Sequence, residues 1–357
     1  NFFSAVPSGY SAICTGALSI ASEVDPAQTD DDYPQKLFNV LKNSATGGDS
    51  YTGLGFQPDL VWVKWLGGDQ SHGLFDSSRG TTKVLNSDNN NTEATSSGLT
   101  SFDSDGYTMG TFYNQSGREY MGLAWRANGG TTSSGSGDLT STHQVDPSDG
   151  FSIVLAQGDG GSGDKTVTHG MSAAPDCILA KRRDNSGRNW DTYWSSGLTS
   201  GYGLRLNTTD SELSGRWGTV NSSIFTCKDG YTWGGTDNYI YYCFRNIEGY
   251  IKAGSYEGNN DADGTFVYTG FRPAFILLKS MDSSDDWVMY DKKRDGYNEV
   301  TKALAANLTS AEQTSNRQLD ILSNGFKPRT SNSNVNGSNT YVYLAMAHNP
   351  FQYATAR

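Results

Sequence analysis

Charged residues are scarce in this 357-residue chain, at 18% of the total, and acidic residues prevail, which gives a formal net charge of −11. Proteins that bind nucleic acid need a basic face, because they neutralise phosphates. The charge balance therefore argues against a nucleic-acid partner and fits a protein that works outside a cell or in a particle. No apolar run approaches the roughly 20 residues that span a bilayer, so we expect no membrane insertion.

Cysteine and histidine are also rare, with four of each. No CxxC pair is present, so the cysteines predict neither a disulfide framework nor a metal site. The histidines are scattered, and none stands in an HExxH motif or beside a GxSxG elbow. No pair of carboxylates stands out as the acid and base of a glycoside hydrolase. The sequence thus predicts no catalytic centre and favours a protein that is not an enzyme.

Helical periodicity is nearly absent as well. The best candidate is 298–308, where Leu304 and Leu308 lie four residues apart, and it predicts at most one short helix or a turn. Gly, Ser, Thr, Asn and Asp are abundant, which is typical of many short strands joined by tight turns. We therefore predict an all-β protein.

One stretch occurs three times, as Pro58–Lys64, Pro175–Lys181 and Pro273–Lys279. Each copy has a proline, mostly apolar residues and a final lysine. Proline has no N–H for a ladder and suits the start of a strand. The short run rich in β-branched and aromatic residues favours a buried strand over a helix.

Two further markers recur in the same order. A turn of Asp-Gly or Asn-Gly type follows each proline-led strand, and a tyrosine-led strand follows each turn. The turns are 105–107, 229–231 and 324–326, and the strands are 120–125, 239–244 and 341–346. Three markers in one order indicate three tandem homologous β-sandwich units of jelly-roll or concanavalin-like type. The alternative is that the copies are blades of one propeller-like or prism-like body.

The markers also predict domain boundaries. Residues 1–34 contain a strand at Tyr10–Cys14 and an acidic linker, and we interpret them as the tail of an upstream domain. The Gly/Ser/Thr-rich stretch 128–149 predicts a flexible linker or exposed loop. The three sandwich units are expected at 35–127, 150–247 and 250–357.

Polar pairs recur after the proline-led strand in two copies. Asp76 with Arg79, and Asp291 with Arg294, stand three apart across a turn, where a bidentate ion pair would pin the loop. A polar ligand site is the other interpretation. The second copy breaks the pattern at 193–197.

Two further groups suggest binding. Aromatic residues cluster in the second copy outside the repeated strands, and exposed rings there would serve as stacking platforms for sugar or protein, while core packing is the alternative. They are Trp190, Tyr193, Trp194, Trp217 and Trp233. The acidic loops 159–164, 259–263 and 282–286 offer oxygen ligands of the kind that Ca²⁺ takes, although none matches an EF-hand loop. No other cofactor is expected.

Several stretches together resemble a repeat region of virion proteins from tailed bacteriophages, especially marine phages and prophages. Pro7–Cys14 is similar to the end of the SPRY-like, concanavalin-like sandwich that such repeats often follow. The stretches that carry the resemblance are Gly55–Lys64, Leu74–Gly80, Ser101–Tyr107, Phe266–Pro273, Leu319–Lys327 and Asn349–Arg357. The resemblance implies no catalytic residues.

From the resemblance we expect a virion structural or adhesion protein at the particle surface, part of a tail fibre or capsid fibre that attaches to a host. Its expected partners are other virion proteins and further copies of itself, with a trimer favoured, and a host-surface glycan. A glycan-binding, lectin-like module is the alternative, and a polysaccharide-degrading enzyme is less favoured.

Overall fold

The computed structural model describes residues 34–348. In that range the chain forms antiparallel strands and two short 3-10 segments, η1 (Pro34–Lys36) and η2 (Thr111–Tyr113), with no α-helix. The predicted all-β class is confirmed. No helix in the same range is long and apolar enough to cross a membrane. The predicted strand Tyr10–Cys14 and the stretch Asn349–Arg357 lie outside the described residues.

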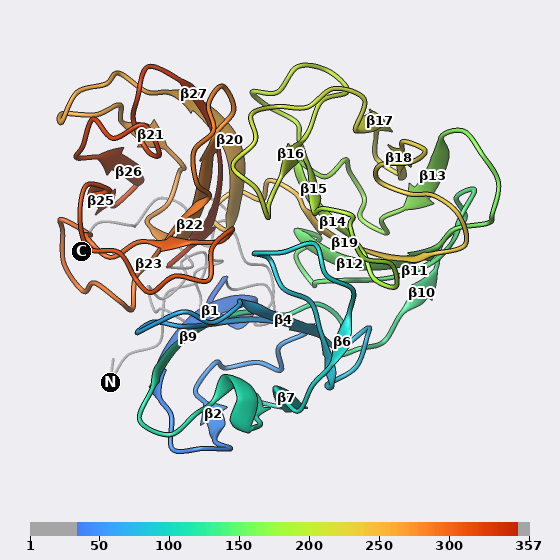
Figure 1. Ribbon diagram of the computed structural model, residues 1–357, viewed down its shortest axis with the longest axis horizontal. Coiled ribbons are helices and arrows are strands. Elements are labelled where there is room, and N and C mark those ends of the chain that lie inside the picture. The colour runs from blue at the N-terminus through green and yellow to red at the C-terminus, as the bar shows by residue number, and fades with distance from the viewer. Residues whose placement is uncertain (1–33, 349–357) are drawn as a thin grey trace, which may run out of the picture.

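Figure 1 shows three lobes around a common centre, which we name first (38–125), second (133–244) and third (251–347). The first lobe has a four-stranded sheet of order β1-β9-β3-β4, a three-stranded sheet β2-β8-β7 and the ribbon β5-β6. Its strands are β1 (Phe38–Ser44), β2 (Ser50–Thr52), β3 (Leu60–Trp65), β4 (Gly73–Asp76), β5 (Lys83–Val84), β6 (Ala94–Thr95), β7 (Leu99–Asp103), β8 (Gly106–Met109) and β9 (Glu119–Trp125).

The second lobe has a seven-stranded sheet of order β10-β11-β12-β19-β14-β15-β16 and a three-stranded sheet β13-β18-β17. Its strands are β10 (Ser133–Ser134), β11 (Thr140–Val145), β12 (Phe151–Gln157), β13 (Lys165–Thr168), β14 (Cys177–Arg182), β15 (Asp191–Trp194), β16 (Leu204–Arg205), β17 (Trp217–Val220), β18 (Ile224–Cys227) and β19 (Asn238–Phe244).

The third lobe has a five-stranded sheet of order β20-β27-β22-β23-β24 and a three-stranded sheet β21-β26-β25. Its strands are β20 (Ile251–Glu257), β21 (Val267–Tyr268), β22 (Pro273–Ser280), β23 (Val288–Asp291), β24 (Leu304–Ala305), β25 (Leu319–Leu322), β26 (Gly325–Pro328) and β27 (Thr340–Ala347). In all three lobes the last strand of the lobe pairs between its proline-led strand and an earlier strand.

Both faces of each large sheet are buried, which explains why the proline-led strands are apolar at consecutive positions. In β3, Val61 and Val63 pack toward the three-stranded sheet of their own lobe. Leu60 and Trp62 point the other way, into a core that draws residues from all three lobes. Strand residues alternate between faces, so one run fills two cores.

Aromatic rings join the lobes at the centre of the shared core. The Trp125 ring lies 4.9 Å from Phe38 of its own lobe, 6.3 Å from Phe244 and 6.1 Å from Phe275, measured between centroids. Phe151 and Phe244 of the second lobe are 5.0 Å apart. Each lobe therefore has a core between two sheets, which is consistent with a β-sandwich, and the lobes also pack on one another.

Hydrogen bonds repeat around this ring. In each lobe the residue just before β4, β15 or β23 donates a ring N–H to a backbone carbonyl of the neighbouring lobe, in one cyclic direction. The bonds are Trp190 Nε1 to Asn86 O at 2.8 Å, Trp287 Nε1 to Arg205 O at 2.8 Å, and His72 Nε2 to Ala305 O at 3.1 Å.

The tautomer of His72 follows from its two partners. The indole N–H of Trp62 donates to Nδ1 of His72 at 2.9 Å, so Nδ1 carries no proton and Nε2 must donate to Ala305. Burial lowers the pKa of His72 to about 3, which keeps the imidazole neutral.

A second set of bonds runs around the ring in the backbone. A glutamate N–H in each lobe donates to a carbonyl two residues after the final lysine of a proline-led strand in the next lobe. The bonds are Glu93 N to Arg183 O at 2.6 Å, Glu212 N to Met281 O at 2.8 Å and Glu312 N to Leu66 O at 2.9 Å. The two sets of hydrogen bonds satisfy backbone carbonyl groups at each of the three interfaces between lobes.

Two local expectations are corrected. The stretch expected as a linker supplies β10 and β11, and β11 pairs with β12 from Thr140 to Val145. Its β-branched residues fit an outer strand once β12 offers a partner edge. The stretch 298–308 forms no helix, because Leu304 and Ala306, two residues apart, both point into the shared core as in a strand.

Candidate functional site

Three buried lysines hold the turns after the proline-led strands. Lys64, Lys181 and Lys279 are at most 1% exposed. Each ammonium donates to two backbone carbonyls, at 2.7 and 3.1 Å for Lys64, 2.8 and 3.0 Å for Lys181, and 2.5 and 2.9 Å for Lys279. Burial lowers the pKa of each to about 8. The residues were visible as the recurrent end of the repeated stretch, but their carbonyl partners were not.

The Asp76–Arg79 pair lies at the end of β4 and is completely buried. The Arg79 guanidinium bonds the Asp76 carboxylate through Nε and donates to Leu74 O at 2.9 Å, while the Arg79 N–H donates to Asp76 Oδ1 at 2.9 Å. The hydroxyl of Tyr242, from the second lobe, donates to Asp76 Oδ2 at 2.7 Å. The pair closes a turn and also joins two lobes.

Asp291 and Arg294 repeat the geometry at the end of β23. Arg294 bonds the carboxylate through Nε, and its Nη2 donates to Met289 O at 2.9 Å. In the second lobe Trp194 takes the aspartate's place, opposite Cys177 in the register, and stacks on Trp287 of the third lobe at 6.1 Å. These buried pairs pin loops and have no face open to a ligand.

The expected aromatic platform in the second lobe is corrected. Trp190, Trp194, Trp217 and Trp233 are at most 3% exposed. Tyr193 is half-buried and packs edge-on against Trp217 at 5.9 Å. The tryptophan rings fill two cores, one on each face of the seven-stranded sheet, and one of these cores is shared with the other lobes.

The acidic loops use their carboxylates in ion pairs. Asp159 pairs with Lys165 at 2.7 Å, Asp164 with Lys228 at 2.5 Å, and Asp263 with Lys327 at 2.7 Å. Between residues 34 and 348, no group of three or more His, Cys, Asp and Glu side chains is placed to hold a metal ion.

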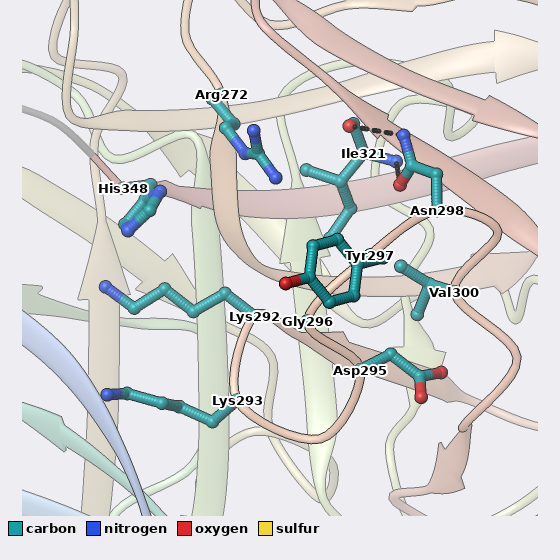
Figure 2. A pocket seen from close by; sticks show the side chains of 10 residues that line it. All are labelled: Arg272, Lys292, Lys293, Asp295, Gly296, Tyr297, Asn298, Val300, Ile321 and His348. Atoms are coloured by element: carbon teal, nitrogen blue, oxygen red, sulfur yellow. Dashed lines mark hydrogen bonds between the residues drawn. The ribbon is translucent and has the colours of Figure 1, made fainter. Parts of the chain in front are cut away.

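A cavity of about 190 Å³ opens in the third lobe beside the Asp291–Arg294 turn. Figure 2 shows Arg272, Lys292, Lys293 and His348 on one side of it and Tyr297 near its middle. Asp295 is the one acidic residue in its lining, with Gly296, Asn298, Val300 and Ile321 completing it. The alternative interpretation of the Asp291–Arg294 turn as a polar ligand site pointed to this region, but Lys292-Lys293, where the other two copies have Ser-Ser, was not singled out.

A larger cavity of about 630 Å³ lies on the first lobe. Its lining includes Phe112, which is 53% exposed, and Tyr113, and carries no charged residue. The cationic cavity of the third lobe is therefore the better candidate for a site that recognises a charged ligand.

The chain is an all-β protein of three interlocked lobes, and comparison with known families places it in one. A domain of unknown function, DUF7483, matches residues 33–350, so the chain belongs to that family. No curated protein and no solved structure matches the chain.

Proposed function

We propose that this protein is a structural and adhesive component of a tailed-bacteriophage particle, built from three homologous copies of one sandwich unit. The shared strand order of the large sheets and the two cyclic sets of inter-lobe hydrogen bonds support the triplication. Equivalent residues make equivalent bonds in each lobe, which is expected when one unit has been copied and the copies have kept their interface.

The observation that carries the structural role is the closure of the ring within one chain. Every large sheet is buried on both faces, and each lobe bonds both neighbours through buried groups. Such a body resists local opening, because exposing one lobe would uncover apolar surface on the other two. Rigid bodies of this kind suit the outside of a particle.

A homotrimer remains part of the proposal, with fewer surfaces open to its interface. Ring closure already covers the inner sheets, so trimerisation of the chain would use the outer surface or residues beyond 34–348. Light scattering behind a sizing column measures the mass. A trimer supports a fibre component, and a monomer moves the proposal to a decoration protein mounted on another assembly.

The experiment that tests the virion role is direct. Mass spectrometry of purified particles from the source culture should contain the chain, and an antibody against the ring should label the particle surface in electron micrographs. Particles that lack the chain would overturn the proposal.

A glycan-binding role is the second candidate, and one observation favours it. The third-lobe cavity combines cations with an aromatic ring that is 89% exposed, Tyr297. Small-molecule sites join a few placed polar groups to apolar or aromatic surface in this way.

A further inference from the structure

The three lobes differ at one equivalent place, the residue after the proline of the proline-led strand. The first lobe has Asp59 there, the second has Asp176 and the third has Ala274. Asp59 is fully buried, and its carboxylate accepts from Ser77 Oγ at 2.5 Å, from Ala127 N at 2.6 Å and from Gly129 N at 3.0 Å. The first lobe thus encloses an anion in a cradle of donors.

The second lobe builds the same cradle. Ser195 Oγ donates to Asp176 Oδ1 at 2.7 Å, and Asn246 N donates to Asp176 Oδ2 at 2.8 Å. The serine begins the turn after β15, as Ser77 does after β4, and its N–H bonds the aspartate's own carbonyl in both lobes. A carboxylate bonded by the first serine of the turn is therefore a shared feature of two lobes, fully buried in the first and partly exposed in the second.

The third lobe keeps the place and loses the carboxylate. Lys292 stands where Ser77 and Ser195 stand, and its N–H bonds Ala274 O at 3.0 Å in the same way. His348 is equivalent to Ala127 and Asn246. It lies two residues after Met346, which pairs with Phe275 of the proline-led strand. Both residues line the third-lobe cavity. Two positions that hold a protein carboxylate elsewhere face an open space here.

The charges around this space are positive and poorly neutralised. Neither Lys292 nor Lys293 has a carboxylate at ion-pair distance among residues 34–348. Burial, with Lys293 adding repulsion, lowers the pKa of Lys292 to about 8, so it still carries its charge at neutral pH. The buried Nε of Arg272 has no hydrogen-bond partner in the same described range.

The acidic residue of the lining is already engaged. Asp295 Oδ2 accepts from Thr301 N at 2.7 Å and from Lys302 N at 2.8 Å. Its carboxylate closes its own loop and keeps its charge, so the lining carries one acidic side chain against Lys292, Lys293 and Arg272. Ammonium and guanidinium groups both suit a carboxylate ligand.

Tyr297 indicates what carries the carboxylate. Its ring stands within the cavity region in Figure 2 and is 89% exposed, the highest value among the exposed large hydrophobic residues of the described range. A ring beside a cationic site gives a sugar an apolar face to lie on, with its acid group directed at the cations.

We propose that this third-lobe cavity binds the carboxylate of an acidic sugar, such as a uronic acid in a surface polysaccharide. The sugar's acid group would lie beside Lys292, whose equivalents Ser77 and Ser195 bond an aspartate in the other lobes. The assignment deepens the adhesive role proposed above, and it rests on that role only for the source of the ligand.

The test is calorimetric titration of the whole chain with trigalacturonate, galactose and sodium acetate, at one fixed ionic strength because screening weakens such contacts. We expect trigalacturonate to bind, galactose not to bind, and acetate to bind at least tenfold more weakly than trigalacturonate. Lys292→Ser, which installs the first lobe's residue, should weaken trigalacturonate binding at least tenfold. Lys252→Ser, a change on β20 outside the cavity lining, should leave it unaltered.

A double change, Ala274→Asp with Lys292→Ser, rebuilds the first lobe's pair and should abolish binding, with urea unfolding confirming that the fold persists. Absence of trigalacturonate binding to the unaltered chain, or an equal loss in Lys252→Ser, would overturn the site. Equal affinity for acetate and trigalacturonate would overturn the assignment of the ligand as a sugar. The virion proposal fails separately, through particles that lack the chain.

Discussion

The first and third lobes share a buried Asp–Arg ion pair and differ at the residue that follows its aspartate. Both end the strand after the proline-led strand with a buried Asp–Arg pair, Asp76–Arg79 and Asp291–Arg294, bonded to the same backbone positions. One residue after the aspartate, the first lobe has Ser77 against an enclosed Asp59, and the third has Lys292 at a cavity. The lobes share the pair that closes the turn and differ at the next residue, which bonds a buried carboxylate in the first lobe and lines a cavity in the third.

The difference shows which of two neighbouring positions the first and third lobes share and which they do not. The ion pair is buried against the neighbouring lobe, so any change there leaves a charge without a partner. The carboxylate of Asp59 is bonded by Ser77 of the same turn, and in the third lobe the equivalent residue, Lys292, lines a cavity instead. Five predictions test this comparison, in order of decreasing effect.

Breaking the buried Asp–Arg pair in either lobe should have the largest effect on stability. Arg79→Leu and Arg294→Leu should each lower the free energy of unfolding by about 3–5 kcal/mol, because each leaves a buried aspartate uncompensated. Urea denaturation measures the change. Lys42→Leu, which breaks the half-exposed Lys42–Glu119 pair, is the control and should cost less than about 1 kcal/mol. Equal costs for buried and exposed pairs would contradict the role given to the turn.

Removing the enclosed carboxylate comes next. Asp59→Ala should lower the free energy of unfolding by about 2–3 kcal/mol, because three donors around it lose their acceptor. The loss stays below that of the ion pair, since burial raises the pKa of Asp59 and the carboxylate itself is costly to enclose. Asp69→Ala, at an exposed position, should change it by under about 0.5 kcal/mol. A neutral result for Asp59→Ala would mean that the cradle does not need its anion.

The pH dependence of binding sharpens the contrast at Lys292. Its pKa of about 8 in the fold, against an ordinary 10.5, predicts that trigalacturonate affinity falls about tenfold between pH 7 and pH 9 as the ammonium loses its proton. Lys293 and Asp291 act on it directly, and Arg272, His348 and Asp295 line the same cavity. Titration calorimetry at several pH values would show the fall. A flat profile would remove Lys292 from the site.

The same lysine makes a matching contribution to stability. Because its pKa is lower in the folded chain, the unfolded chain binds more protons between pH 8 and 10.5, and the free energy of unfolding gains from a rise in pH over that window. The same increase in stability with pH is expected from the other buried lysines with a lowered pKa, Lys64, Lys181 and Lys279. The slope should decrease in Lys292→Ser but keep its direction.

The smallest effect is expected at Tyr297. Tyr297→Ala should weaken trigalacturonate binding about fivefold, or roughly 1 kcal/mol, and leave acetate binding and unfolding unchanged, because the exposed ring touches only the sugar. Tyr268→Ala, another exposed tyrosine of the third lobe outside the cavity lining, is the control. A loss of stability in Tyr297→Ala would show that the ring serves the fold instead.

Local pattern was enough to locate most strands. The three proline-led stretches form β3, β14 and β22, and the tyrosine-led stretches form β9, β19 and β27. The register also places Cys177 with Leu60 and Phe275, as alignment of the three copies predicts. The function expected from the phage resemblance stays a prediction.

Long-range packing explains where the sequence misled. The tryptophans of the second copy fall outside the repeated strands, which suggested exposure, but Trp190 and Trp194 are covered by the first and third lobes. An apolar run that alternates between two cores looks the same as one buried in a single sandwich. Burial by a lobe that is distant in the sequence leaves no local period to detect.

The sequence by itself determined the strands, their threefold order and the Asp–Arg turns, because strand period, turn chemistry and short-range ion pairs depend on neighbours in the chain. Only the tertiary structure decided that the lobes close into a ring, that His72 donates to Ala305, and that Lys292 faces a cavity where two other lobes hold an aspartate. Those facts depend on which groups remain to desolvate and satisfy one another once distant strands have met.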